Sequence, residues 1–391
     1  MNKKLKIALI SSALLTGNAF AVDKMDDLET SRMVFTKEIW EKNQENPLAQ
    51  LYIAEQHYLQ DEKDLALKWY LKSALNKNES AKNNALLMIE LGEGVEANMD
   101  DVVSFLEKIG LEGNLFAQTF LGEVYRSGDY HQNLEKSYFW YSEAAKQGDD
   151  RSQYFVGTMS INGIGTYQNI PKGMRVLESL AEKGNVNAMY ILGKINKIGF
   201  NVAKNHKEAA KWFDMAAKEG NVQAMYEIAD SLERGYGVPR DSKKALEWFE
   251  TSAHHGFNDA AYRSGLLYLE LSIMGDAEYT VDFAKHWLEI AANEGSVEAQ
   301  MRLGDLYYDG KYNVDKNYKE AEKWYKLAAS QGDRLSYKKL SLIYRVGGYG
   351  TKRDDNAYKE AIRNFYTMER KTTVTSKVDK TNIFGLDAFL Y

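Results

Sequence analysis

A short block of residues recurs along this chain with a period near 36 residues, and this repeat constrains the fold more than any other feature. In each copy a large residue, most often Trp, precedes a pair of small residues and then a Gly. In one copy, Trp212 is followed by Ala216, Ala217 and Gly220. A period of this length is typical of stacked supersecondary units, none of which can bury its apolar face alone. The chain is therefore predicted to be an array of repeats that presents a long surface to a partner.

The position of the Trp within the block, which we term the Trp slot, has an architectural role, because six of the seven tryptophans occupy it. Extending the frame in both directions gives nine slots and therefore predicts nine repeats. The slot residues, in chain order, are Trp69, Phe105, Trp140, Val176, Trp212, Trp248, Trp287, Trp324 and Phe365.

A second pattern, counted from the Gly that closes each block, predicts the first helix of a repeat. After Gly295, residues of one helix face recur at Ala299, Leu303 and Tyr307, which are offsets of four, eight and twelve. A further Gly fifteen residues on, here Gly310, favours the left-handed conformation that ends a helix. We name this predicted helix helix A.

The second helix of each repeat, helix B, begins at a predicted N-cap seven residues before the Trp slot. Asn and Asp are favoured at such a position because the side-chain oxygen accepts a free backbone N–H. Nine helix–turn–helix units give about eighteen helices and almost no strand, so the predicted fold class is all-α. The predicted caps are Asn98, Asn133, Asn169, Asn205, Asp241 and Asn317.

These residues resemble the Sel-one-like repeat family. The resemblance rests on Ala-x-x-x-Leu-Gly-x-x-Tyr-x-x-Gly, Lys-Ala-x-x-Trp and Ala-Ala-x-x-Gly, and it covers roughly residues 47–370. It implies a right-handed α/α superhelical solenoid of the tetratricopeptide type, in which the A helices line the concave side. Residues 22–46 are expected to form an N-terminal capping helix. The apolar end of the tail at 371–391 is expected to cover the last repeat, with a detachable docking peptide as the alternative.

The first 21 residues have the features of a secretory signal. Three lysines precede a short apolar stretch from Ile7 to Gly17, and Ala19-Phe20-Ala21 is a small-x-small cleavage site. We expect a periplasmic or secreted protein. Its composition contains no Cys, and the net charge of −6 becomes −9 once the three lysines of the signal are removed. An acidic chain disfavours nucleic acid as a partner, and no later stretch has the ~20 apolar residues that membrane insertion needs.

Signals of catalysis are nearly absent, so the chain is predicted not to be an enzyme and to need no cofactor or metal. Without Cys there is no thiolate nucleophile or ligand, and neither a Gly-x-Ser-x-Gly nor a His-Glu-x-x-His motif occurs. The pair His254–His255 falls at a polar helix end, where a cationic side chain suits the helix dipole.

Two intervals between blocks are longer than the others. Gly256 to Gly295 spans 39 residues, and Trp324 to Phe365 spans 41, which places an insertion at 346–355. Insertions in repeat proteins fall in loops where recognition is often elaborated. Drift in a tolerant turn is the alternative explanation.

The candidate partner-binding surface is a row of tyrosines with nearby carboxylates. Four tyrosines stand six residues after successive block glycines and therefore share one face of four consecutive A helices. They are either binding anchors or packing residues between neighbouring repeats. The acidic residues nearby favour a basic segment of a protein partner. The tyrosines are Tyr154, Tyr190, Tyr226 and Tyr262, and the acidic residues are Asp230, Glu233, Asp259, Glu298 and Asp305.

The resemblance implies a non-enzymatic binding scaffold, and it leaves two roles open. Some exported members look like immunity proteins that inhibit a secretion-system effector such as a lipase. Others bind host proteins as virulence factors. A cell-wall or β-lactam-acting enzyme is the alternative from a different class, and the missing nucleophile argues against it.

Overall fold

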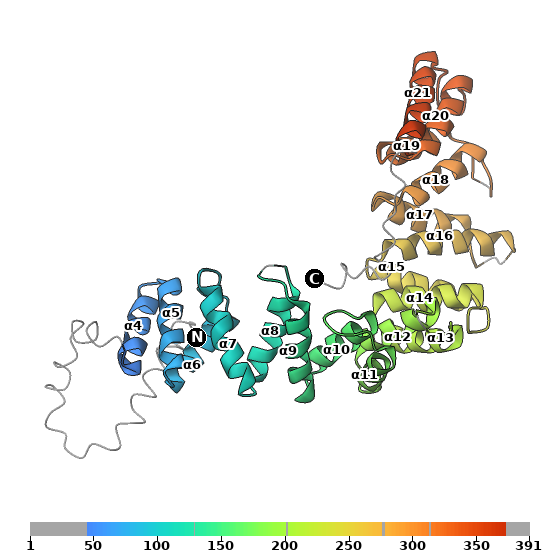
Figure 1. Ribbon diagram of the computed structural model, residues 1–391. Helices are drawn as coiled ribbons and strands as arrows, with labels where there is room; N and C mark the ends of the chain where they lie inside the picture. Colours follow the sequence, from blue (N-terminus) through green and yellow to red (C-terminus); the bar gives the residue numbers. More distant parts are fainter. Residues whose placement is uncertain (1–44, 129, 201, 276–277, 313, 373–391) are drawn as a thin grey trace. The chain divides into compact units, whose positions relative to one another are not determined.

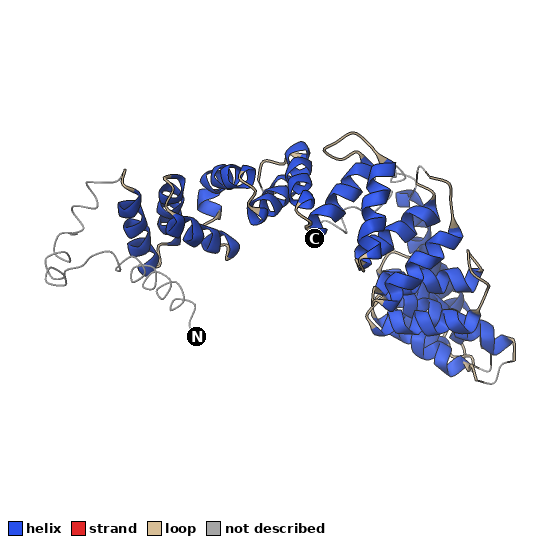
Figure 2. Cartoon of the chain, turned by 90° about the horizontal axis from the view of Figure 1, so that it is seen from below, coloured by secondary structure: helices blue, strands red, loops and turns tan. Residues whose placement is uncertain are grey.

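The computed structural model describes residues 45–372, apart from 129, 201, 276–277 and 313 (Figure 1). These residues form eighteen α-helices, α4 to α21, and one short 3-10 helix, η2 (Glu96–Asn98). One isolated bridge, between Gly348 and Thr351, is the only β pairing in this part of the chain, and Figure 2 shows helices joined by loops. The all-α prediction is confirmed. The predicted signal, the capping helix and the tail from 373 onward lie outside the described residues.

Helices A and B alternate along the chain, as the repeat pattern predicts, and they make nine pairs. The A helices are α4 (Pro47–Leu59), α6 (Glu79–Glu90), α8 (Leu115–Arg126), α10 (Asp150–Asn162), α12 (Val186–Ile198), α14 (Val222–Arg234), α16 (Asn258–Ile273), α18 (Val297–Asp309) and α20 (Arg334–Val346). The B helices are α5 (Lys63–Leu75), α7 (Met99–Leu111), α9 (Leu134–Lys146), α11 (Ile170–Glu182), α13 (His206–Lys218), α15 (Ser242–His254), α17 (Val281–Asn293), α19 (Tyr318–Ser330) and α21 (Asp355–Thr372).

The chain divides into two compact units, one up to Asn169 and one from Ile170 onward, and each is described by itself. In the first unit, α5 packs against α4, α6 and α7, and α8 lies between α7 and α9. In the second unit, every helix from α11 to α21 packs against the next one in the sequence. Contacts between sequence neighbours are what a repeat array requires. None of the described helices combines the length and apolar composition that a membrane-spanning segment needs.

Four of the six predicted N-caps make the expected side-chain bond. The Asn205 side chain accepts the backbone N–H of Glu208 at 3.1 Å and begins α13. Asn98 makes no such bond, and its amide instead donates to the backbone carbonyls of Asp64 and Gly94, each at 2.8 Å. It therefore ties the start of α7 to α5. Side-chain caps are also made by Asn133, Asp241 and Asn317. Four of the A helices end at a Gly in the left-handed conformation: Gly163, Gly199, Gly235 and Gly310.

The residue immediately after the Trp slot forms the core of each of the first eight repeats, a role that the Trp pattern does not reveal. Phe249 is fully buried, whereas its neighbour Trp248 is only partly buried. Helix A makes room for this side chain with a small residue: a Cβ added to Gly304 would lie 2.4 Å from the Tyr325 ring. The residues at this position are all at most 1% exposed, and they are Tyr70, Leu106, Tyr141, Leu177, Phe213, Phe249, Leu288 and Tyr325.

The additional residues between Gly256 and Gly295 lengthen a helix and do not lie only in a loop. Helix α16 has 16 residues, whereas its neighbours α14 and α18 have 13. Three added residues thus supply most of one helical turn. The turn that follows contains Gly275 at φ 84°, and Thr280 begins α17 as its N-cap.

The last repeat has a different register from the predicted one. The backbone N–H of Asp354 bonds to the carbonyl of Tyr344, and its side chain accepts the N–H at the third position of α21, as an N-cap does. Seven residues after this cap, the Trp slot is Ala361, which is 5% exposed. The prediction of Phe365 as the ninth slot is therefore wrong. From Trp324 to Ala361 is 37 residues, so the predicted insertion is also wrong.

Candidate partner-binding surface

Three of the four predicted tyrosines lie on consecutive A helices of the second unit. Tyr190 is on α12, Tyr226 on α14 and Tyr262 on α16, whereas Tyr154 lies on α10 in the first unit. Their shared offset gives them equivalent positions on these helices. The described residues leave open whether they bind a partner, so the site remains a prediction.

The rings of Tyr190 and Tyr226 pack against helix B of their own repeat, and Tyr226 also contacts the start of the next helix A. The centroid of the Tyr190 ring is 6.0 Å from that of Phe213, and Tyr190 is 7% exposed. Tyr226 lies 5.4 Å from Phe249 and 5.2 Å from Phe257, again between ring centroids. Tyr226 remains half-buried, so an edge of its ring is open to solvent while most of the ring holds two helices together.

Burial raises the pKa of three of the tyrosines, Tyr154, Tyr226 and Tyr262. Burial raises the pKa of Tyr154 to about 12. Burial is also the main reason why the pKa of Tyr226 is raised, and the charges of Asp230 and Asp259 raise it further against the opposing charge of Arg263. These hydroxyls are therefore available as neutral hydrogen-bond donors.

Asp230 is held by two cations. It is 8% exposed, and its carboxylate lies 3.2 Å from the Lys197 ammonium on α12 and 2.5 Å from the Arg234 Nε. Burial by itself raises the pKa of the Asp230 carboxyl, but the hydrogen bond from Arg234 and the charge of Lys197 outweigh it and lower the pKa. Asp230 is thus a structural link between two A helices.

Two other predicted acidic residues also link consecutive A helices. Glu233 on α14 pairs with Arg263 on α16. Asp305 on α18 accepts a hydrogen bond from the Lys339 ammonium on α20 at 2.7 Å. It also accepts the hydroxyl of Tyr325 at 2.7 Å. These carboxylates are satisfied within the repeat array, which reduces the charge that they offer to a partner.

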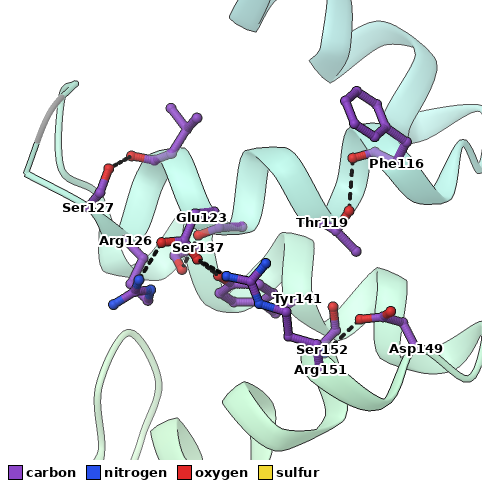
Figure 3. Close-up of polar contacts among 12 residues, drawn as sticks. Phe116, Thr119, Glu123, Arg126, Ser127, Ser137, Tyr141, Asp149, Arg151 and Ser152 are labelled. Carbon is purple, nitrogen blue, oxygen red and sulfur yellow. Dashed lines mark hydrogen bonds and ion pairs between the residues drawn. The ribbon is translucent and has the colours of Figure 1, made fainter. Parts of the chain in front are cut away.

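The same arrangement occurs in the first unit, where Figure 3 shows it in detail. Glu123 on α8 accepts a hydrogen bond from Arg151 on α10 at 3.0 Å and from the Tyr141 hydroxyl at 2.8 Å. Arg126, one turn further along α8, pairs with the same carboxylate. An ion pair between successive A helices is therefore a recurrent feature of both units.

Asp259 and Glu298 differ from the other carboxylates. Both are exposed in the first turn of their helices, α16 and α18, three residues after a block Gly. Within the described residues, neither makes an ion pair. Asp259 acts electrostatically on Tyr226 of the preceding helix A, and Glu298 acts on Tyr262. An exposed carboxylate whose charge acts on a half-buried tyrosine is thus repeated on adjacent repeats.

Sequence reasoning missed the cations of this surface. Lys197, Arg263 and Lys339 stand seven or thirteen residues after a block Gly, about one repeat along the sequence from the carboxylates that they neutralise. The recurrence of Lys or Arg at fixed offsets from the block Gly was the sequence signal that could have identified these cations. Arg302 occupies the same offset as Arg263 and acts electrostatically on Tyr262, so the surface is not uniformly acidic.

No group of three or more His, Cys, Asp or Glu side chains converges within the described part of the chain in a way that would hold a metal ion. His254 ends α15, as predicted, and its ring lies 5.0 Å from the Trp287 ring in an edge-to-face arrangement. A cavity of about 660 Å³ in the second unit lies between two A–B turns and is lined by residues including Tyr279, Tyr307 and Tyr312.

Comparison with protein families gives a match to the Sel1 repeat in seven segments. Together these segments cover more than half of the chain. They are residues 48–78, 115–149, 150–185, 186–221, 222–257, 258–296 and 297–333. No curated protein sequence matches the chain.

Solved structures of similar fold come from several bacteria. The structure of c5321, a protective antigen present in uropathogenic Escherichia coli strains, is 26% identical, covers 85% of this chain and 72% of its own, and has a TM-score of 0.63. A Sel1 repeat protein from Oxalobacter formigenes is 25% identical over 56% of this chain and 89% of its own, with a TM-score of 0.46. An immunity protein from Pseudomonas aeruginosa is 19% identical over 56% and 82%, with a TM-score of 0.30. The last two TM-scores are too low to support an argument about this chain.

Proposed function

Because this chain belongs to the Sel1 repeat family, we propose that it is an exported, non-enzymatic scaffold that binds a protein partner through its A helices. Export is inferred from the predicted signal at residues 1–21. The all-helical repeat fold supports the scaffold role, since arrays of this kind serve as extended binding surfaces.

The repeated pairing of tyrosine with carboxylate is the observation on which the proposal depends. Tyr226 contacts Phe257, two residues before Asp259, and the charges of Asp259 and Glu298 act on Tyr226 and Tyr262, respectively, on the A helices of adjacent repeats. A carboxylate next to an aromatic ring suits a Lys or Arg side chain, because the ring face and the carboxylate both attract a cation. We therefore propose that a basic segment of the partner crosses α14, α16 and α18.

Reversing the charges of this surface is expected to slow association. In the double variant Asp259→Lys and Glu298→Lys, the association rate should fall roughly tenfold at low salt and become less sensitive to salt, because exposed charges act mainly on encounter. The measurement is surface plasmon resonance at several salt concentrations with the partner recovered by cross-linking and mass spectrometry.

The matched control is Glu247→Lys, a charge reversal at an exposed position of helix B on α15. It should leave the association rate within about twofold of the unaltered chain, because an isolated remote charge contributes little to steering. The control changes the net charge half as much as the double variant, so slowing in proportion to that change would show that only net charge matters and would remove Asp259 and Glu298 from the site.

Two biological roles fit such a scaffold. We propose first an immunity-type role, in which the partner is a secretion-system effector such as a lipase that acts in the periplasm; this follows from the family resemblance. The second candidate is an exported factor that binds a host protein. Its supporting observation is the likeness to the structure of c5321, which is described as a protective antigen.

Competition between strains distinguishes the two roles. An immunity role predicts that cells lacking this gene die when they are mixed with parental cells, and that the gene restored in trans protects them. Equal survival of both strains in the mixture would reject the immunity role and leave host-protein binding as the working proposal.

A further inference from the structure

The last repeat differs from the others where helix B would meet a following repeat. Five residues after the Trp slot, each of the first eight repeats has Ala or Gly. The corresponding residue of the last repeat is Tyr366, which is 59% exposed. The eight small residues are Ala74, Gly110, Ala145, Ala181, Ala217, Ala253, Ala292 and Ala329.

In interior repeats this part of helix B contacts the next helix A. Gln300 on α18 donates a hydrogen bond to the carbonyl of Ala292, which is the equivalent of Tyr366, at 2.8 Å. Tyr141, immediately after the slot, stacks on Phe155 of the next helix A with ring centroids 4.6 Å apart. Tyr366 therefore marks a contact surface for which the repeat array supplies no further helix within the described residues.

Three further residues of the last repeat belong to this surface, because their equivalents in interior repeats contact the next repeat. The residue after the last slot is Ile362, which is partly exposed although its eight equivalents are buried. On helix A, residues ten or thirteen positions after the block Gly pair with the next helix A in several repeats, as Asp305 does with Lys339 and Glu233 does with Arg263. On α20 these positions are Leu342 and Arg345. We name Leu342, Arg345, Ile362 and Tyr366 the end face.

A repeat of the ordinary kind does not suit the end face. Interior repeats have Ala or Gly at the position of Tyr366, so that the next helix A can approach closely, as α18 does at Ala292. The Tyr366 ring stands at that position in the last repeat, whereas the Phe365 ring lies beside the Arg334 guanidinium of α20 in its own repeat. A segment that covers the end face must therefore be thinner than a helix and fit around the Tyr366 ring.

The chain contains such a segment after α21. Residues 383–391 are almost entirely apolar and include one charge, Asp387. Helix α20 offers the opposite charge, because it contains four basic residues and no acidic one. One of the four, Lys339, is engaged by Asp305, whereas Lys338 and Arg345 are exposed. The apolar character and the charge of the segment both complement the end face.

The connecting segment is long enough for this contact within one molecule. About ten residues separate the end of α21 from Ile383, and an extended segment of that length spans up to roughly 33 Å. Helix α20 has 13 residues and is therefore about 20 Å long. The chain can thus reverse direction and reach any point of the α20–α21 pair.

We propose that residues 383–391 dock on the end face of the same chain and close the open end of the repeat array, with Asp387 directed toward Lys338 and Arg345. The docked segment takes the place that the next helix A occupies in an interior repeat. This inference does not depend on the proposed partner or on the proposed role, and it is tested without either.

Hydrogen exchange of the full chain and of a variant that stops after Asn382 gives the first test. Removal of the segment should accelerate amide exchange in α20 and α21 roughly tenfold or more, because their apolar contacts are lost. Exchange in α14 serves as the internal reference and should not change, because α14 lies six helices before α20 along the chain. Unchanged exchange in α20 and α21 after truncation would overturn the proposal.

A synthetic peptide of residues 381–391 gives the second test. It should bind the truncated chain saturably in fluorescence anisotropy and restore slow exchange, but it should bind the full chain at least tenfold more weakly, since the face is already covered. Tyr366→Asp in the truncated chain should abolish binding. Leu327→Asp is the matched control, because Leu327 is an exposed apolar residue of α19 away from the end face, and it should leave peptide binding unchanged.

Two results would identify another occupant and overturn the proposal. If the full chain is a dimer in sedimentation and Tyr366→Asp dissociates it, while truncation has no effect on its mass, the end face binds a second copy. If truncation abolishes binding of the partner protein and leaves exchange in α20 and α21 unchanged, the segment is a docking peptide for that partner.

Discussion

Replacing Phe249 by Ala is expected to lower the free energy of unfolding by about 3–5 kcal/mol, the usual range for a buried large aromatic side chain. Phe249 on α15 is fully buried. It contacts Tyr226 of its own helix A, and the Arg263 guanidinium of the next helix A lies 5.8 Å from its ring. Its removal therefore weakens the packing within one repeat and between two.

The neighbouring residue supplies the control for this prediction. Trp248→Ala removes a larger side chain, but Trp248 is only partly buried, so the loss should be smaller than for Phe249→Ala. Both variants are measured by urea denaturation followed by circular dichroism. A larger loss for Trp248→Ala than for Phe249→Ala would show that in this repeat the Trp slot contributes more to the core than the residue after it.

The second large effect is expected at Gly237, in the turn between α14 and α15. This Gly has φ 75°, and a Cβ added to it would lie 2.0 Å from the backbone carbonyl oxygen of His206 at the start of α13. Because backbone atoms cannot move aside as a flexible side chain does, Gly237→Ala combines an unfavourable φ with a steric clash. We expect a loss of about 2–4 kcal/mol in the free energy of unfolding.

Gly220→Ala separates the two contributions. Gly220 also has a positive φ, 91°, but no heavy atom lies within 4 Å of the added Cβ. The substitution should therefore cost only about 1–2 kcal/mol, the penalty of a left-handed conformation. Equal losses in the two variants, measured by the same denaturation experiment, would mean that the turn at Gly237 does not approach α13 as closely as described.

Features that are local in sequence could be predicted well. The cap at Asn205 and the left-handed Gly at the end of α18 each depend on a few neighbouring residues, and both are confirmed. The prediction of Phe365 as the last slot is wrong because it extended a spacing without using the cap. Asp354, which the structure identifies as the N-cap of α21, would have fixed the register at Ala361.

The candidate site was harder to predict because it depends on contacts between repeats. The tyrosine offset correctly places Tyr226 and Tyr262 at equivalent positions on adjacent A helices. The sequence does not show that Asp230 is buried against Lys197, since these residues are 33 positions apart and meet only in the stacked array. Their pairing is a property of the packing between repeats, as is the exposure of Asp259.

Hydrogen exchange of the chain with and without the partner tests most directly whether a protein partner binds across α14, α16 and α18. We expect slowed exchange in the first turns of α16 and α18, around Asp259 and Glu298, and little change in α13, α15 and α17. Protection confined to those B helices, or to α20 and α21, would contradict binding across α14, α16 and α18.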